Sequence, residues 1–208
     1  MKRFLLYMTL LFIVQCSVPK NDRNYHQEYT HYLDQYKKGF IDSARSPLGK
    51  EDLDDLDFYH GDKSWKLICA CESARESKPF EMPTYSGVTR TYILHSIATC
   101  KYNNHIIKLN LYKNIHHPIN PLYKNNLFLP FKDHTNGEET YGGGRYINLL
   151  VTDIKGGKIV IDFNKAYNPW CAYSDGFNCP IPPKENHIGM SVLAGEKKFK
   201  GAYKKANG

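Results

Sequence analysis

The pattern of short apolar runs from residue 65 onward restricts the fold of this chain more than any other feature. The runs are rich in β-branched and aromatic residues, and turn residues such as Ser86-Gly87 and Asn103-Asn104 separate them. The expected strands span residues 65–71, 88–95, 97–102, 106–112, 127–131, 146–153, 158–164 and 188–194. Many short strands without strand–helix alternation predict an all-β protein, either an antiparallel β-barrel or a sandwich.

A β-hairpin is the clearest single element that the sequence predicts. Residues 146–153 and 158–164 flank Gly156-Gly157, a pair that suits a two-residue turn. In the second strand Ile159, Ile161 and Phe163 occupy every other position. This alternation places them on one face of the expected strand, toward a core.

An N-terminal amphipathic helix is expected over residues 24–44. Tyr25, Tyr29, Tyr32, Tyr36 and Phe40 recur there at helical spacing. We expect this aromatic stripe to pack on the sheet; the alternative is an aromatic face for a membrane or a partner.

The first residues resemble an export signal. Lys2 and Arg3 precede an apolar run over residues 4–14, which is too short to span a bilayer of roughly 30 Å but suits a signal peptide. The Ile-Val-Gln-Cys sequence that ends at Cys16 resembles the lipobox of bacterial lipoproteins, in which the cysteine is lipidated. We therefore expect a signal peptide at 1–15, a lipidated tether at 16–23, and one β-rich domain at 24–208. The protein would be exported and anchored by palmitate or a similar lipid to a membrane of the cell envelope; ordinary cleavage nearby is the alternative.

The charge of the chain suggests few partners. The formal net charge is +7, and removal of Lys2 and Arg3 with the signal peptide leaves +5. The remaining lysines are spread along the chain, so a nucleic-acid partner is not expected. No metal or other cofactor is expected either, because neither H-E-x-x-H nor C-x-x-C spacing occurs.

The segment over residues 130–186 combines glycines, prolines, acids and polar aromatics, and we expect any functional site there. Three consecutive glycines precede Arg145; they could hold an anion with their backbone N–H groups, and the guanidinium suits a carboxylate or phosphate. The alternative is a glycine-rich bulge with Arg145 paired to Asp133, Glu139 or Asp162. The predicted ligand-binding residues are Asp133, Glu139, Gly142, Gly143, Gly144, Arg145, Asp162, Asn164 and Glu185.

The cysteines predict at least one disulfide. Cys171 and Cys179 lie eight residues apart, and in an exported protein such a pair is expected to be bonded. A nucleophilic Cys171 with His187 as its base is the weaker alternative. Cys100 is expected to pair across the sheet with one of the two cysteines at positions 69 and 71.

Several sequence motifs resemble one known family. G-G-G-R-Y, I-D-F-N-K-A-Y-N-P-W-C-A-Y, C-P-I-P-P-K-E-N and A-G-E-K-K-F are similar to those of domain-of-unknown-function family 1684. The upstream stretches S-P-L, M-P-T-Y-S-G and L-P-F-K-D-H-T-N-G-E-E-T-Y resemble the same family. The resemblance covers about residues 25–199 and implies a single domain, without an established activity.

Three functions therefore remain open. The first is a membrane-anchored module that binds a polar or anionic small ligand. The second is a hydrolase with Glu139 or Asp162 as general base and Arg145 as a stabiliser of negative charge. The third is a structural envelope lipoprotein whose polar residues only hold loops together. An open cavity with converging polar groups would favour the first two functions, and a buried, mutually satisfied network would favour the third.

Overall fold

A computed structural model describes residues 20–115 and 124–205 of the chain. It contains one α-helix, α1 (Lys20–Asp42), within this part. The strands are β1 (Lys66–Ser73), β2 (Phe80–Pro83), β3 (Thr89–Tyr102), β4 (His105–Asn114), β5 (Asn126–Phe131), β6 (Arg145–Leu150) and β7 (Lys158–Asp162). The short 3-10 helices are η1 (Lys50–Asp55), η2 (Lys63–Trp65), η4 (Val151–Asp153), η5 (Phe163–Lys165), η6 (Trp170–Ala172) and η7 (Lys184–Asn186). The predicted signal peptide and Cys16 lie outside the described residues.

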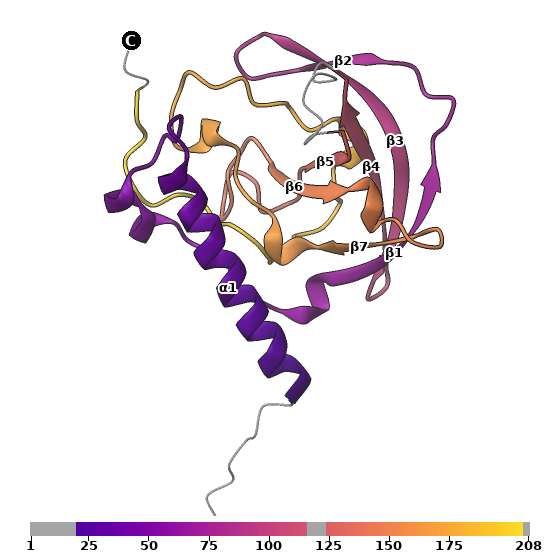
Figure 1. The fold of residues 1–208 in the computed structure, drawn as a ribbon, viewed down its shortest axis with the longest axis horizontal. Helices are drawn as coiled ribbons and strands as arrows, with labels where there is room; N and C mark the ends of the chain where they lie inside the picture. The colour runs from indigo at the N-terminus through magenta and orange to yellow at the C-terminus, as the bar shows by residue number, and fades with distance from the viewer. Residues whose placement is uncertain (1–19, 116–123, 206–208) are drawn as a thin grey trace, which may run out of the picture.

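The strands form one antiparallel sheet that curves into a half-barrel (Figure 1). Its order is β6-β5-β4-β3-β1-β7, and β2 pairs with β3 beside this path. Helix α1 lies across the outside of the domain, on the side where β6 and β7 are found (Figure 1). The predicted class, a barrel-like all-β fold with an N-terminal helix, is confirmed. None of the helices in the described part is both long and apolar enough to cross a membrane.

The alternation of side chains explains why these residues form a sheet with a core on its concave face. In β1, Leu67, Cys69 and Cys71 are buried, whereas Ile68 between them is 72% exposed. The antiparallel register of β1 and β3 sets Cys69 opposite Cys100, and these two residues form a disulfide. Cys71 is buried and carries a free thiol. The expected cross-sheet pairing is therefore made by Cys69.

Helix α1 is attached to the β domain by its tyrosines. The rings of Tyr25, Tyr29, Tyr32 and Tyr36 stack successively, with centroids 6.2–6.5 Å apart. Each of their hydroxyls donates a hydrogen bond to a residue of the β domain. Phe40 completes the stripe and is buried in a second hydrophobic cluster. The helix is thus confirmed at nearly the predicted bounds, and its aromatic stripe packs on the domain.

Two predicted strand boundaries differ from the structure. The runs 88–95 and 97–102 are one continuous strand, β3, with a register shift between Leu94 and Ser96. The break in the sequence pattern marks this irregularity and not a turn. The predicted disulfide between Cys171 and Cys179 is present and closes a loop that begins within η6.

Candidate functional site

Arg145, at the start of β6, is completely buried. Its Nη2 forms an ion pair with the Oδ2 of Asp133, 2.8 Å away, and both side chains are 0% exposed. The same guanidinium donates to the backbone carbonyls of Val192 (3.0 Å), Ala194 and Glu196 (3.3 Å). Breaking such a pair is costly because an uncompensated charge remains inside the protein. This is the geometry of the buried network, the alternative that the sequence left open.

The same network explains why residues 188–194 do not form the strand that the sequence predicts. Val192 and Ala194 lie in irregular backbone that fills the interior of the half-barrel. Their carbonyls accept from the Arg145 guanidinium, so they need no neighbouring strand. The N–H of Val192 donates to Asp133 at 3.2 Å. The prediction of a final strand is wrong because a side chain replaces a strand as the hydrogen-bond partner.

The glycine run before Arg145 allows a close approach between segments. Gly144 has φ +93°, and a Cβ atom there would lie 2.7 Å from the carbonyl oxygen of Phe131 and 2.7 Å from Cγ of Pro182. A side chain at this position would therefore push the start of β6 away from the end of β5. The carbonyl of Gly143 accepts a hydrogen bond from the hydroxyl of Tyr85 at 2.9 Å.

Of the other predicted site residues, Asp162 and Asn164 are hydrogen-bonded to each other at 2.9 Å, whereas Glu139 and Glu185 lie elsewhere. Glu139 is exposed and accepts a hydrogen bond from the Tyr59 hydroxyl at 2.9 Å. Asn164 is buried, accepts from the backbone N–H of Asp62 at 2.9 Å and donates to the carbonyl of the same residue at 2.8 Å. Glu185 is exposed on η7. The structure thus divides the predicted residues among several places.

The predicted hairpin has hydrogen bonds at its turn and at its far end, but its two arms do not pair between these points. Lys155 and Lys158 exchange two backbone hydrogen bonds across the turn, at 2.9 and 3.1 Å, and Gly156-Gly157 has positive φ at both residues, as a two-residue turn requires. Tyr146 and Tyr167 exchange another two, at 2.9 and 3.0 Å. These two tyrosines are equally far along the chain from the turn, so the pair Tyr146–Tyr167 and the pair Lys155–Lys158 share one hairpin register.

Between these two ends, β6 and β7 do not pair with each other. The 3-10 helices η4 and η5 interrupt the two arms, β6 pairs with β5, and β7 pairs with β1. Consequently β6 and β7 are the two edges of the half-barrel. The hairpin prediction is right at its turn and wrong over the paired strands, because the local alternation of residues does not specify the partner strand.

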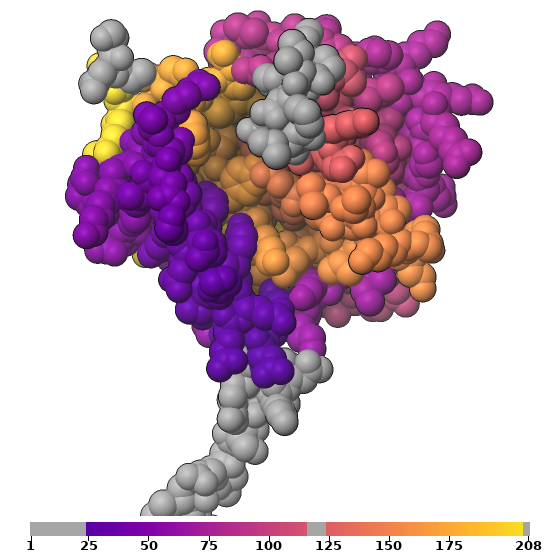
Figure 2. Space-filling model, viewed as in Figure 1, coloured from indigo at the N-terminus to yellow at the C-terminus, as the bar shows by residue number. Residues whose placement is uncertain are grey.

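A cleft of about 800 Å³ lies along this opening. Figure 2 shows the surface hollowed between the indigo helix α1 and the orange segment that contains β6 and β7. The lining residues come from α1 and the segment after it, from β1, β3, β5, β6, η4, β7 and η5, and from the segment with the second disulfide. They are Tyr32, Tyr36, Arg45, Lys66, Arg90, Tyr92, Phe128, Tyr146, Ile147, Asn148, Leu149, Asp153, Val160, Asp162, Lys165, Tyr167, Pro169, Trp170, Phe177, Asn178, Cys179 and Pro180. Of the predicted site residues, Asp162 belongs to this lining, where it also accepts from the Tyr25 hydroxyl at 3.1 Å.

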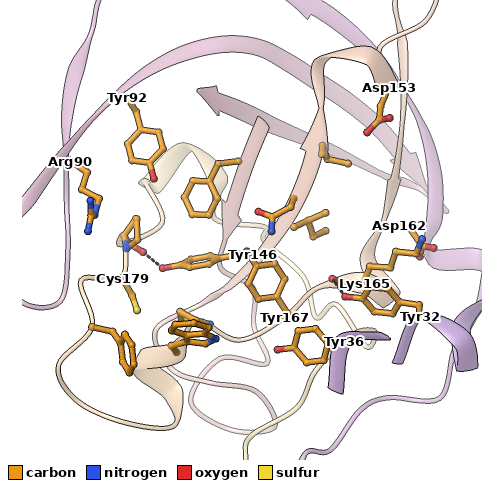
Figure 3. A pocket seen from close by; sticks show the side chains of 18 of the residues that line it. Tyr32, Tyr36, Arg90, Tyr92, Tyr146, Asp153, Asp162, Lys165, Tyr167 and Cys179 are labelled. Atoms are coloured by element: carbon orange, nitrogen blue, oxygen red, sulfur yellow. Dashed lines mark hydrogen bonds between the residues drawn. The ribbon is translucent and has the colours of Figure 1, made fainter. Parts of the chain in front are cut away.

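Aromatic rings follow one another along the cleft (Figure 3). Tyr36 lies 6.2 Å from Tyr167, which lies 5.9 Å from Tyr146 in an edge-to-face arrangement. Phe128 is 4.8 Å from Tyr146, and Tyr92 is stacked 5.6 Å from Phe128. Such separations are typical of aromatic pairs that contribute about 0.5–1.5 kcal/mol each beyond their burial. These contacts between the rings therefore stabilise one wall of the cleft.

The cleft lining carries an excess of positive charge. Arg45, Lys66, Arg90 and Lys165 line it, against two carboxylates. Lys66 is near Glu28 (3.5 Å), and the ammonium of Lys165 lies over the ring of Tyr32. In the described part of the chain, no carboxylate lies within ion-pair distance of either arginine. The two arginines are thus available to an anion.

The family model described as "Protein of unknown function (DUF1684)" matches residues 51–197 of the chain. The chain belongs to this family. Its fold is also similar to the solution NMR structure of an uncharacterised protein from Haloarcula marismortui, with a TM-score of 0.66 and 27% sequence identity. That likeness covers 86% of this chain and 96% of the other. No curated protein matches the chain.

The resemblance motifs supply much of the cleft of this DUF1684 protein. Tyr146 ends the G-G-G-R-Y motif, Tyr167 and Trp170 lie in the I-D-F-N-K-A-Y-N-P-W-C-A-Y motif, and Cys179 and Pro180 begin C-P-I-P-P-K-E-N. Reasoning from charge and glycine content led to Arg145 and missed these aromatic residues. The concentration of polar aromatic residues in these motifs was the signal in the sequence that could have located them.

A second residue that the sequence analysis missed is Glu196, a carboxylate that the structure buries completely. It accepts hydrogen bonds from the hydroxyls of Tyr36 (2.8 Å) and Tyr173 and from the N–H of Asn168 (2.8 Å). Burial raises the pKa of Glu196 to about 7, and these hydrogen bonds oppose part of that rise. Burial also raises the pKa of Tyr36 well above its ordinary value. Glu196 therefore holds Tyr36, a residue of the cleft wall, in place through the hydrogen bond that it accepts from the Tyr36 hydroxyl.

In the described part of the chain, no group of three or more histidine, cysteine, aspartate or glutamate side chains is arranged to hold a metal ion.

Proposed function

We propose that this DUF1684 protein is a binding module that holds a small anionic ligand in the cleft between α1 and the opening of the half-barrel. One observation supports the proposal above all: a cleft of about 800 Å³ contains two arginines without a carboxylate partner among the described residues. A volume of this size matches those of small-molecule sites, which are concave and mostly pre-formed. A guanidinium can hold a carboxylate or phosphate with two parallel hydrogen bonds.

Arg90 is the better placed of the two arginines. It lies on β3 and is partly buried, whereas Arg45 is exposed in the segment after α1. Figure 3 shows Arg90 beside Tyr92 at one end of the cleft, with Lys165 and Asp162 at the other end. An anion at Arg90 would therefore be separated from the Asp162 carboxylate.

The hydrolase alternative gains little from the geometry. Glu139 does not line the cleft, and Asp162 accepts hydrogen bonds from the Tyr25 hydroxyl and from Asn164 (2.9 Å). We therefore favour the binding function over the hydrolase function. The buried Arg145 network supports the structural alternative for that one part of the molecule only.

A thermal-shift panel of small carboxylates, phosphates and sulfates tests the binding function. At a concentration of one hundred times Kd, a ligand adds about 2.7 kcal/mol to stability. For a domain of this size the corresponding rise in Tm is roughly 5–10 °C. Arg90→Gln should reduce this shift, whereas Arg75→Gln, which replaces an exposed arginine outside the cleft, should leave it unchanged. If no anion in the panel raises Tm at millimolar concentration, the proposed function is wrong.

We also propose that the domain acts at a membrane of the cell envelope, anchored by a lipid on Cys16. The two disulfides support an oxidising compartment. Cells that express the full chain and are fed labelled palmitate should yield a labelled protein in the membrane fraction. Cys16→Ala should abolish the label, and an equally labelled variant would contradict the anchor.

A further inference from the structure

The walls of the cleft present ring faces more than hydrogen-bonding groups. The hydroxyls of Tyr32, Tyr36 and Tyr146 already donate to a carbonyl of Lys165, to Glu196 and to a carbonyl of Pro180, respectively. Asparagine side chains lie beside the hydroxyls of the other two lining tyrosines, Tyr92 and Tyr167. These bonds orient the rings, and they leave few hydroxyl groups for a polyhydroxylated ligand such as a sugar.

Apolar side chains complete the walls between the tyrosines. Phe128, Leu149, Val160, Trp170 and Phe177 all contribute to the lining. Against this apolar part of the wall, a ligand covered with hydroxyl groups would lose its water without gaining matching partners, and each unmatched group would weaken binding. A ligand with an apolar body would gain from burial against the same walls, in proportion to the area that it covers.

We infer that the occupant of the cleft is an anionic amphiphile, a molecule with an apolar chain and one acidic head group. This inference rests on the proposed function and names the class of ligand. The chain would lie along the aromatic wall from Tyr146 toward Tyr36, and the head group would contact Arg90. Arg90 is the cation best suited to this role, because Lys165 lies at the other end of the cleft and interacts with Tyr32 (Figure 3). Lys66 pairs in register with Asp162 at that same end and lies near Glu28.

Saturated carboxylates of increasing length form the test series. The full chain is placed in vesicles of phosphatidylcholine and titrated with butyrate, hexanoate, octanoate and decanoate; protein-free vesicles correct for partition of the acids into lipid. Two readouts follow binding: the Tm of the domain and the fluorescence of Trp170, which lines the cleft. Trp65, the other tryptophan, is buried in the core beside Tyr102 and serves as a constant background.

We expect the affinity to increase about fourfold for each added methylene, as for burial of an apolar chain. Octanol, which lacks the charge, should bind more weakly than octanoate. Arg90→Gln should remove this difference, whereas the matched Arg75→Gln should keep it. Trp170→Phe should abolish the fluorescence change and retain the Tm shift, which locates the ligand in the cleft.

Three outcomes would overturn the inference in distinguishable ways. If butyrate or glucuronate binds as tightly as decanoate, the cleft takes small polar anions; the amphiphile is then wrong and the proposed function stands. If octanol and octanoate bind equally and Arg90→Gln has no effect, the anionic head group is wrong. If none of the probes changes Tm or fluorescence, both the amphiphile and its contact with Arg90 are wrong, and the wider anion panel then decides the proposed function.

Discussion

Replacement of Arg145 by methionine should destabilise the protein more than any change of a surface charge. Methionine keeps part of the length of the side chain and removes its charge and donors. The ion pair with Asp133 is fully buried, and loss of one partner of such a pair costs about 3–5 kcal/mol. The carbonyls of Val192, Ala194 and Glu196 also lose a donor, and each unsatisfied carbonyl adds about 1 kcal/mol or more. The lower ends of these figures add up to a loss of about 6 kcal/mol, a large part of the roughly 5–15 kcal/mol that stabilises a typical domain.

Urea unfolding followed by circular dichroism measures this loss, provided that the slope m stays the same in the variant. Lys38→Met is the matched control. Lys38 forms an ion pair with Asp42 on α1, but its side chain is 61% exposed. Exposed pairs at this helical spacing contribute about 0.3–0.5 kcal/mol. The control should therefore unfold at almost the same urea concentration as the unchanged protein.

A double variant separates the effect of the lone charge from the effect of lost packing. Arg145→Met combined with Asp133→Asn removes both charges of the buried pair, so the double variant should be more stable than Arg145→Met alone. The reasoning is refuted if Arg145→Met costs less than about 1 kcal/mol, close to the control. It is also refuted if the second substitution lowers stability further, because the buried charge of Asp133 would then not be the source of the cost.

Three further predictions concern other parts of the fold. The folded state raises the pKa of Glu196 from an ordinary 4.5 to about 7, so the folded protein binds the proton of this carboxyl group more tightly than the unfolded chain does. The resulting stabilisation is on the order of 3 kcal/mol. It is complete below pH 4.5 and is lost as the pH rises to about 7. Urea midpoints should show this decline in the unchanged protein and lack it in Glu196→Gln; parallel pH profiles would contradict the assignment. Gly144→Ala should lower the stability of the protein clearly more than Gly137→Ala. Both glycines have φ near +90°, but only a Cβ atom at position 144 would meet other atoms. Equal losses of stability in thermal unfolding would contradict a close approach at Gly144. Opening the longer disulfide loop with Cys69→Ala should cost about 1 kcal/mol more than opening the shorter one with Cys171→Ala, if chain entropy governs both; the reverse order in urea unfolding would show that native packing dominates.

The class of the fold could be predicted because alternation and helical spacing are local patterns. Every-other-residue burial in β1 and the tyrosine spacing of α1 depend on residues that are neighbours in the chain. The turn at Gly156-Gly157 and the disulfide between Cys171 and Cys179 are local in the same sense. The family motifs likewise consist of short contiguous stretches.

The location of the site could not be predicted in this way, because it depends on which strands pair. The turn at Gly156-Gly157 suggested that β6 and β7 pair with each other, yet each pairs with another strand, and the cleft lies in the space between them. Likewise, the charges alone made Arg145 equally suited to a ligand or to a buried acid. Its burial in the core with Asp133 decides the question, since burial and hydrogen-bond partners arise only when distant segments pack together. The residue types and local elements are therefore readable from the chain, whereas the opening of the half-barrel and its aromatic wall follow from contacts between residues far apart in sequence.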